Sequence, residues 1–424
     1  MESTELVAAV RRGDAEAVRE LLDGGADPET RDPADGLPLL CAAVAAYDEK
    51  VAEALVEAGA DPLRPLPDGG APLLRAVDGG STTMTSAVLP ETVRLTHEQR
   101  ARLLDRARFW TGTDLEAELR RRTGASGPAV RERVEDPDDF CHYEQITLGG
   151  LTVRDGHAGV LILLEERFGT GAPFDEVLAR ALARPDRGHA VWREAVVRLS
   201  FRRHEPTWAA AAGLRDHPDR LRRLFAADLL RLMAVSGPHD GYRPPAGRDI
   251  ALFFPWASEE EDPEVLALVL DAVIDEGDGY AEDIGALGLR HATHPDPRVR
   301  CVVPYLLSGD EGSPDALSAR LEALYALARD PDPDVREQTA YQLTHVRGEA
   351  PGIEDVLAGL LDDDLRDTRV HAARALALRG DPRCVEAARR LRPLDPDGGP
   401  DGDLMRAMWA YEDAAARTAA TETG

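Results

Sequence analysis

An internal repeat near the N-terminus constrains the fold of this chain more than any other sequence feature. The tetrapeptide Gly-Ala-Asp-Pro occurs at 25–28 and again at 59–62, an offset of 34 residues. The same offset relates Pro-Leu-Leu at 38–40 to Pro-Leu-Leu at 72–74. A match that persists at one offset indicates tandem units that stack side by side, because one such unit cannot bury its apolar face alone.

Both copies resemble the ankyrin repeat. The Asp-Gly-x-Thr-Pro-Leu-His-x-Ala signature of that family has degenerate counterparts at 35–42 and 68–76, in which Thr and His are replaced. The closing Leu-Leu-x-x-Gly-Ala-Asp-Pro has counterparts at 21–28 and 55–62. Pro opens a helix, Gly ends one in a left-handed conformation, and Asp-Pro shapes the turn. We expect ankyrin-like repeats over 1–92, with the third copy incomplete.

The next segment, 93–154, is predicted to be a helical connector. Apolar residues between 95 and 119 recur at helical spacing, which indicates one long helix or two. Two β-prone triplets flank a Gly-Gly pair at 149–150, and this pattern is typical of a small hairpin.

A second set of repeats follows. The heptapeptides at 294–300 and 330–336 both read x-Pro-Asp-Pro-x-Val-Arg, at an offset of 36 residues. Fainter copies lie at 218–222, 262–265 and 367–370. The motif is similar to the Asp-Pro-x-x-x-Val-Arg hallmark of the HEAT repeat, and the resemblance implies helical hairpins over 155–393.

Each position of the heptapeptide has a physical role. Asp caps the helix and Pro opens it. We expect Val299 and Val335 to face the core. We expect Arg300 and Arg336 to reach carboxylates of the neighbouring repeat, such as Asp332, so that ion pairs form a ladder along the array.

The last segment, 394–424, is predicted to be a flexible linker followed by an amphipathic helix over 404–417 that caps the array. The expected fold class is therefore all-α: an α-solenoid with a short ankyrin array followed by HEAT-like helical hairpins. The chain resembles actinobacterial repeat proteins of this kind, and its near lack of lysine is typical of a GC-rich genome.

The net charge of the chain limits the classes of molecule that it can bind. It has 50 Lys and Arg against 78 Asp and Glu, a net charge of −28, which opposes binding to phosphate backbones or anionic membranes. The four cysteines are dispersed, which favours a reducing compartment. The first residues do not have the order of a signal peptide, so we expect a cytoplasmic protein.

Catalytic motifs are not found in the sequence, which contains no phosphate-binding loop, nucleophile elbow or His-Glu-x-x-His. We expect no enzyme activity, no cofactor and no metal. Two weak clusters have residue types suited to chemistry: His291, His294, Asp296 and Cys301 could be zinc ligands, and Cys141-His142 with His157 could form a nucleophile–base pair. The simpler interpretations are that His294 takes a helix-capping position and that Cys141 lies in a half-buried loop.

One stretch departs from the acidic character of the chain. Between 193 and 223, eight arginines stand against four acidic residues, with aromatic residues interleaved. Such a stretch can bind a phosphate chain or an acidic peptide. The alternative is that the arginines pair with acidic neighbours while the aromatic rings fill the core. The candidate binding residues are Trp192, Arg202, Arg203, Trp208 and Arg222.

The resemblance to two repeat families implies a non-enzymatic scaffold or adaptor that binds a protein partner on the concave face of the solenoid. The ankyrin turns near 31–35 and 64–69 and the inner HEAT helices are the expected contact regions. The alternative is a HEAT-type nucleic-acid-binding protein or an enzyme of the glycosylase or lyase kind, with the five Arg and Trp residues lining one groove. The sequence leaves the partner and the oligomeric state open.

Overall fold

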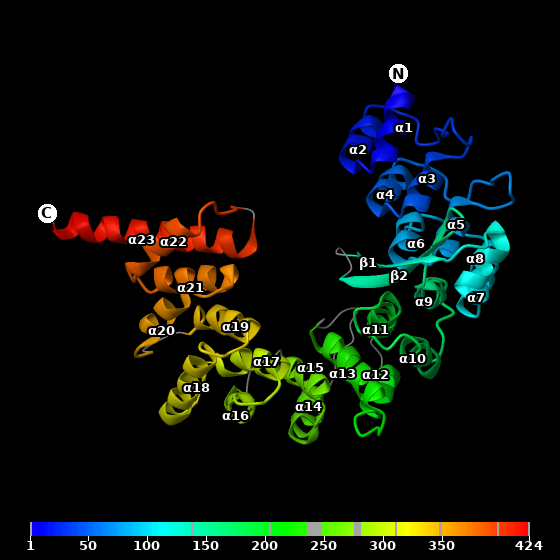
Figure 1. Ribbon diagram of the computed structural model, residues 1–424. Coiled ribbons are helices and arrows are strands. Elements are labelled where there is room, and N and C mark those ends of the chain that lie inside the picture. The colour runs from blue at the N-terminus through cyan, green and yellow to red at the C-terminus, as the bar shows by residue number, and fades with distance from the viewer. Residues whose placement is uncertain are drawn as a thin grey trace. The chain divides into compact units, whose positions relative to one another are not determined.

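The computed structural model describes residues 2–136, 140–202, 205–235, 247–274, 281–309, 312–346, 350–396 and 398–422. About 65% of it is helical, and the described residues form 23 helices and one small three-stranded sheet. The fold is all-α and of the α-solenoid type, as predicted (Figure 1). The chain divides into two compact units, 1–210 and 211–424.

The first unit begins with paired short helices. Its elements are α1 (Glu2–Arg12), α2 (Ala15–Asp23), α3 (Leu39–Ala46), α4 (Glu49–Glu57), α5 (Pro72–Gly79), α6 (Thr82–Val88), α7 (His97–Thr111), α8 (Leu115–Thr123), β1 (Val130–Asp136), β2 (Cys141–Leu148), β3 (Leu151–Arg154), α9 (His157–Arg167), α10 (Phe174–Leu182) and α11 (Ala190–Arg202). Helix α12 (Glu205–Ala212) spans the boundary between the units.

The sequence repeat is visible in how these helices begin. Asp14 and Asp48, 34 residues apart, each accept a hydrogen bond from a backbone N–H in the first turn of α2 and α4. Ser81 does the same for α6. Helices α1, α3, α5 and α7 contact one another in order, and α2, α4, α6 and α9 form a second row behind them.

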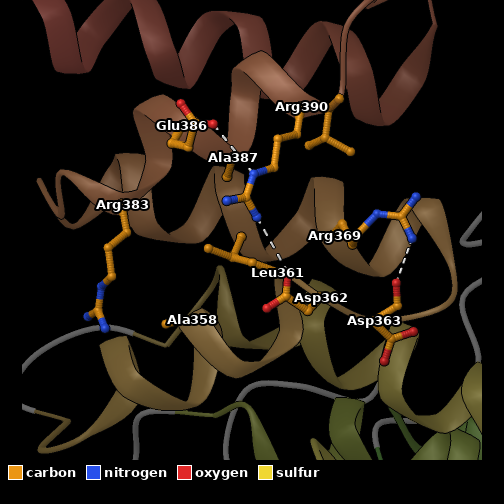
Figure 2. A pocket seen from close by; sticks show the side chains of 10 residues that line it. Ala358, Leu361, Asp362, Asp363, Arg369, Arg383, Glu386, Ala387 and Arg390 are labelled. Atoms are coloured by element: carbon orange, nitrogen blue, oxygen red, sulfur yellow. Dashed lines mark hydrogen bonds and ion pairs between the residues drawn. The ribbon is translucent and has the colours of Figure 1, made fainter.

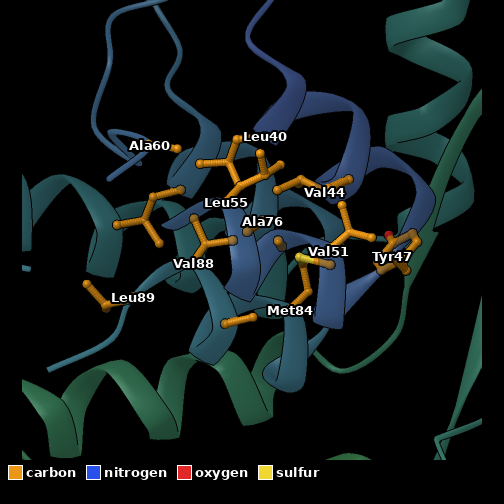
Figure 3. Packing of buried hydrophobic residues seen from close by; sticks show 14 of the residues in the cluster. Leu40, Val44, Tyr47, Val51, Leu55, Ala60, Ala76, Met84, Val88 and Leu89 are labelled. Carbon is orange, nitrogen blue, oxygen red and sulfur yellow. The ribbon is translucent and has the colours of Figure 1, made fainter. Parts of the chain in front are cut away.

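Aliphatic side chains between the two rows form the core of the first unit. Leu40, Leu55, Val51 and Met84 are at most 1% exposed, and Figure 3 shows them meeting between successive helix pairs. Small residues such as Ala76 are buried in the same cluster, and their short side chains allow neighbouring helix pairs to pack closely.

The small sheet packs beside the helices of the first unit. The strands are antiparallel in the order β1-β2-β3, and β2 joins β3 through Gly149 and Gly150, both at positive φ. This is the hairpin that the Gly-Gly pair predicts. Strand β1, whose Arg/Glu alternation carries no apolar signal, adds a third strand.

The second unit consists of helices α13 (Arg220–Val235), α14 (Arg248–Glu259), α15 (Pro263–Ile274), α16 (Ala281–His291), α17 (Pro297–Leu307), α18 (Pro314–Leu327), α19 (Pro333–Leu343), α20 (Ile353–Leu360), α21 (Arg366–Leu378), α22 (Arg383–Arg390) and α23 (Gly399–Glu422). The odd-numbered helices contact one another in sequence order and make one continuous row. Each follows an even-numbered helix, as in stacked helical hairpins (Figure 1).

The physical roles assigned to the heptapeptide are largely confirmed. Val299 and Val335 are fully buried. Arg300 binds the carboxylate of Asp330 through Nε and Nη2, both at 2.7 Å, so the ladder exists. The named acceptor was wrong: Asp332 caps α19 and accepts from the backbone of its first turn, which leaves Asp330 to receive the arginine.

The C-terminal helix α23 starts at Gly399, earlier than the expected 404, because Pro400 suits the first turn of a helix. Leu404 and Ala407 are buried against the preceding helices, while Met405 and Trp409 are exposed. The described part of the chain contains no helix with the length and apolar character needed to cross a membrane.

Candidate binding surfaces

The Arg-rich stretch supplies core residues and ion pairs as well as surface. Trp192 is fully buried in α11, so its ring cannot contact a ligand unless the core opens. Arg202 binds Glu166 and donates to the carbonyl of Ala172 at 2.7 Å. Trp208 is half-buried in α12.

The other two candidate residues add little to a groove. Arg222 lies in the second unit, 3.8 Å from Asp219, and Arg203 lies outside the described residues. The units are not placed relative to each other, so the structure does not gather the five residues at one site. Their binding role stays a prediction.

The two clusters weighed for chemistry are held by other contacts. Asp296 caps α17 and binds Arg298, and the ring nitrogen Nδ1 of His294 accepts from the backbone of Asp296. In the other cluster, His142 lies 3.2 Å from Asp186, and His157 bonds the carbonyl of Asp78. Within the described ranges, no three His, Cys, Asp or Glu side chains converge as metal ligands.

His157 is a buried titratable group of the first unit. Its ring stacks on Trp110 at a centroid distance of 4.9 Å and is 2% exposed. Burial lowers the pKa of His157 to about 4, against the smaller opposing effect of Asp78. The imidazole is therefore neutral at physiological pH, and it fixes the position of α9 against α5.

Asp78 organises the face made by the first helices of the ankyrin-like pairs. It lies near the end of α5 and accepts from Trp110 Nε1 at 2.6 Å and from Arg106 Nη2 at 2.7 Å. Arg122 of α8 lies 3.4 Å from the same carboxylate and covers the Trp110 ring. Glu118 holds Arg122 from the other side at 2.8 Å.

Two hollows meet at this carboxylate. The larger, about 840 Å³, lies among the turn at 68–70, α5 and α7, and the smaller, about 390 Å³, lies among α3, α5 and the β2–β3 turn. Their shared lining residues are Asp68, Arg75, Asp78 and Arg122. They form one groove, which we call the inner-helix groove.

Charges alternate along the inner-helix groove. Arg75 binds Asp68 at 2.9 Å, and a backbone N–H from Gly70 together with Arg75 lowers the pKa of the Asp68 carboxyl. Arg102 donates to the carbonyl of Gly69 at 2.6 Å. Phe109 is 44% exposed at the rim. The groove thus presents paired charges beside an exposed aromatic ring.

The sequence indicated part of this groove. The turn at 64–69 was expected to contact a partner, and Asp68 and Gly69 do line the larger hollow. The contributions of α7 and α8 were missed, because nothing local in Arg102, Arg106 or Arg122 marks them as neighbours of the turn. An excess of arginine on predicted helices directly after the repeats was the only available signal.

Two repeat-family models match parts of the chain. The ankyrin repeat family matches residues 2–33, and the HEAT repeats family matches residues 321–399, so the chain carries both kinds of repeat. No curated protein matches the chain. Among solved structures, YibA of Escherichia coli is 17% identical, with a TM-score of 0.41, over 52% of this chain and 75% of that one.

Proposed function

We propose that the protein is a non-enzymatic adaptor that binds a segment of a partner protein in the inner-helix groove. Ankyrin and HEAT repeats support a protein-interaction scaffold. The observation that carries the choice of site is the continuity of two hollows along the first helices, joined by Asp68, Arg75, Asp78 and Arg122.

The chemistry of the groove suits a polypeptide. Four arginines and four carboxylates line the larger hollow, so it offers matched donors and acceptors rather than one sign of charge. The exposed ring of Phe109 provides an apolar contact of the kind enriched at protein interfaces. A chain with a net charge of −28 opposes a polyphosphate ligand.

Position-specific photo-crosslinking tests the proposed site. A photoreactive phenylalanine analogue replaces Phe109 in the full chain, and the matched control carries it at Phe201, which is 62% exposed in the same unit but lines neither hollow. In cells, we expect one discrete crosslinked protein from the Phe109 position only.

A second substitution ties the crosslink to the groove. Arg75→Glu reverses the charge shared by both hollows and should remove the Phe109 crosslink while leaving the helical circular dichroism unchanged. Equal crosslinking from both positions, or a crosslink that survives Arg75→Glu, would show that the partner does not occupy this groove.

A further inference from the structure

Arginines of the second unit repeat one geometry. Arg223, Arg300 and Arg336 each donate Nη1 to the backbone carbonyls six and five residues earlier in the chain. Each directs Nε and Nη2 to a carboxylate of the following repeat. The acceptors are Glu260, Asp330 and Asp363, in that order.

Arg369 begins the same arrangement, but no carboxylate among the described residues completes it. Its Nη1 donates to the carbonyls of Asp363 and Asp364, at 2.5 and 3.0 Å, six and five residues earlier. The junction to the last repeat instead uses Arg366, whose Nη1 and Nη2 bind Asp401 at 2.8 Å each. Among the described residues, no carboxylate side chain accepts a hydrogen bond from Nε or Nη2 of Arg369.

A pocket lies beside the Arg369 side chain. It measures about 520 Å³ and lies among α20, α21 and α22. Figure 2 shows Arg383 and Arg390 extending from α22 toward the end of α20, with Leu361 between them and Arg369 on α21. The apolar lining residues are Ala358, Leu361, Ala387 and Leu391.

Some arginine donors in the pocket are not firmly paired with acidic side chains of the chain, so they can bind another anion. Asp363 is engaged by Arg336. Arg390 lies 3.5 Å from both Asp362 and Glu386, and all three side chains are more than half exposed, so these pairs are weak and easily exchanged. Arg383 is bound more firmly, to Asp381 and Asp355.

We propose that this pocket binds a carboxylate of an acidic segment from a partner protein, clamped by Arg369 with the help of Arg390. The planar guanidinium of Arg369 matches a carboxylate through two parallel hydrogen bonds, as its three counterparts do within the chain. The apolar side chain next to that carboxylate in the partner packs on Leu361 and Ala387.

The structure favours an isolated carboxylate over a polyanion. The lining has three arginines and three acidic residues, so it holds no excess positive charge to attract a phosphate chain. This site lies in the second unit and does not depend on the inner-helix groove of the first, so either proposal can fail alone.

The test uses the full chain and two model peptides, acetyl-Leu-Asp-Leu-amide and acetyl-Leu-Asn-Leu-amide, which differ only in the carboxylate. The arginine Nε–H resonances are followed by NMR during titration. We expect saturable shifts of the Arg369 resonance with the Asp peptide, and binding of the Asn peptide weaker by about tenfold or more, since a charged bidentate contact is lost.

Variants separate the clamp from the fold. Arg369→Gln should weaken binding of the Asp peptide by about tenfold or more. If Arg369→Gln does not fold, Arg390→Glu at the exposed rim gives the same readout. Arg389→Gln is the control. Arg389 lies on α22, as Arg390 does, but its side chain is largely exposed and does not line the pocket.

Three results would overturn the proposal. The first is equal binding of the Asp and Asn peptides. The second is unchanged affinity in both Arg369→Gln and Arg390→Glu. The third is full competition by inorganic phosphate at the same concentration as the peptide, which would identify an unspecific anion site instead of a site for a protein segment.

Discussion

The His157 imidazole, on α9, joins three elements of the first unit through one ring face and one ring nitrogen. It stacks on Trp110 of α7, and its Nε2 bonds the carbonyl of Asp78 of α5. Its Nδ1 is buried, and no hydrogen-bond partner for it lies among the described residues. A proton added at Nδ1 would place an unsolvated charge in the core.

The stability of the first unit should therefore depend on pH through His157. Because the folded pKa, about 4, lies below the usual 6.5, the unfolded chain binds the proton more tightly. The stabilisation is complete above about pH 6.5 and is lost as the pH falls toward 4, by about 2 kcal/mol at pH 5. Urea unfolding of the wild type at about pH 7 and pH 5 measures this loss.

Two variants test whether His157 causes the loss of stability at low pH. His157→Gln should remove most of this pH dependence, whereas His97→Gln, at an exposed position of α7, should keep it. An identical pH slope in the wild type and His157→Gln would contradict the prediction.

At the level of residues, the sequence predicts single roles better than contacts. Val299, Val335 and the arginine ladder follow from one repeated motif, because position within a helical hairpin fixes which way a side chain faces. The meeting of Asp78 with Trp110 could not be read from the sequence, because these residues come from different helices whose packing no local pattern encodes.

Among elements, the ladder links α13, α17 and α19 each to the loop before the next odd-numbered helix. Asp330 is buried. Its carboxylate accepts two hydrogen bonds from Arg300 and one from the backbone N–H of Asp332. Arg300 also binds the carbonyls of His294 and Pro295, in the loop just before its own helix α17. One guanidinium thus ties a loop to its own helix and to its neighbour.

Breaking one link should destabilise the second unit. Asp330→Asn removes the charge opposite a largely buried Arg300 and should cost about 2 kcal/mol in the free energy of unfolding. Arg389→Gln, whose side chain is 70% exposed, should cost less than about 0.5 kcal/mol. Urea unfolding followed by circular dichroism compares the two. Equal losses would mean that the ladder does not stabilise the array.

The end of α5 lies close to the backbone of β3, and this contact can be tested by substitution. Gly80 ends α5 at φ +74°, and a Cβ there would stand 2.0 Å from the carbonyl oxygen of Arg154. Gly124 ends α8 at φ +69° with open space around it. Both positions disfavour a side chain, but only Gly80 is also crowded by backbone.

Gly80→Ala should therefore cost about 3 kcal/mol and Gly124→Ala about 1 kcal/mol, the difference being steric overlap with β3. Thermal unfolding of both variants checks the order. If Gly124→Ala proves as damaging as Gly80→Ala, backbone conformation alone would explain both, and the contact between α5 and β3 would be unimportant.

The elements that the sequence predicted are those with strong end signals. Asp-Pro pairs mark α17 and α19, and a Gly-Gly pair marks the β2–β3 turn. Strand β1 escaped prediction because its alternation is polar and six of its seven residues are charged or exposed. Its place is set by pairing with β2, a tertiary effect that local propensity does not contain.

For the whole molecule, excess negative charge opposes compaction. With 78 Asp and Glu against 50 Lys and Arg, a formal net charge of −28 remains even if every basic side chain pairs with an acidic one. Repulsion among exposed carboxylates acts over distances that salt screens, whereas short buried pairs such as Arg300–Asp330 are screened much less.

The melting temperature should consequently rise by a few degrees between about 20 mM and about 300 mM NaCl, because screening acts mainly on the repulsion. Differential scanning calorimetry measures it, with a neutral osmolyte of equal osmolality as the control. A fall in the melting temperature with salt would show that attraction within exposed ion pairs outweighs the repulsion.

At this scale, repetition made the fold class predictable and left the binding surfaces largely unpredicted. A repeated sequence offset predicts stacked units, whichever residues lie between the matching positions. The inner-helix groove and the pocket beside Arg369 depend on where the repeats stop matching: at α7 and α8 in one unit, and at Arg366 in the other. Departures from a repeat have no pattern of their own to recognise.

The switch from Arg369 to Arg366 at the final junction bears on how such a chain lengthens over generations. Copying an internal hairpin brings a donor and an acceptor in matching register, so the new unit joins both neighbours at once. Copying the last hairpin would instead bring Asp401, which pairs with Arg366 and not with Arg369. Duplication of an internal hairpin would therefore keep both of its junctions paired, whereas duplication of the last hairpin would not.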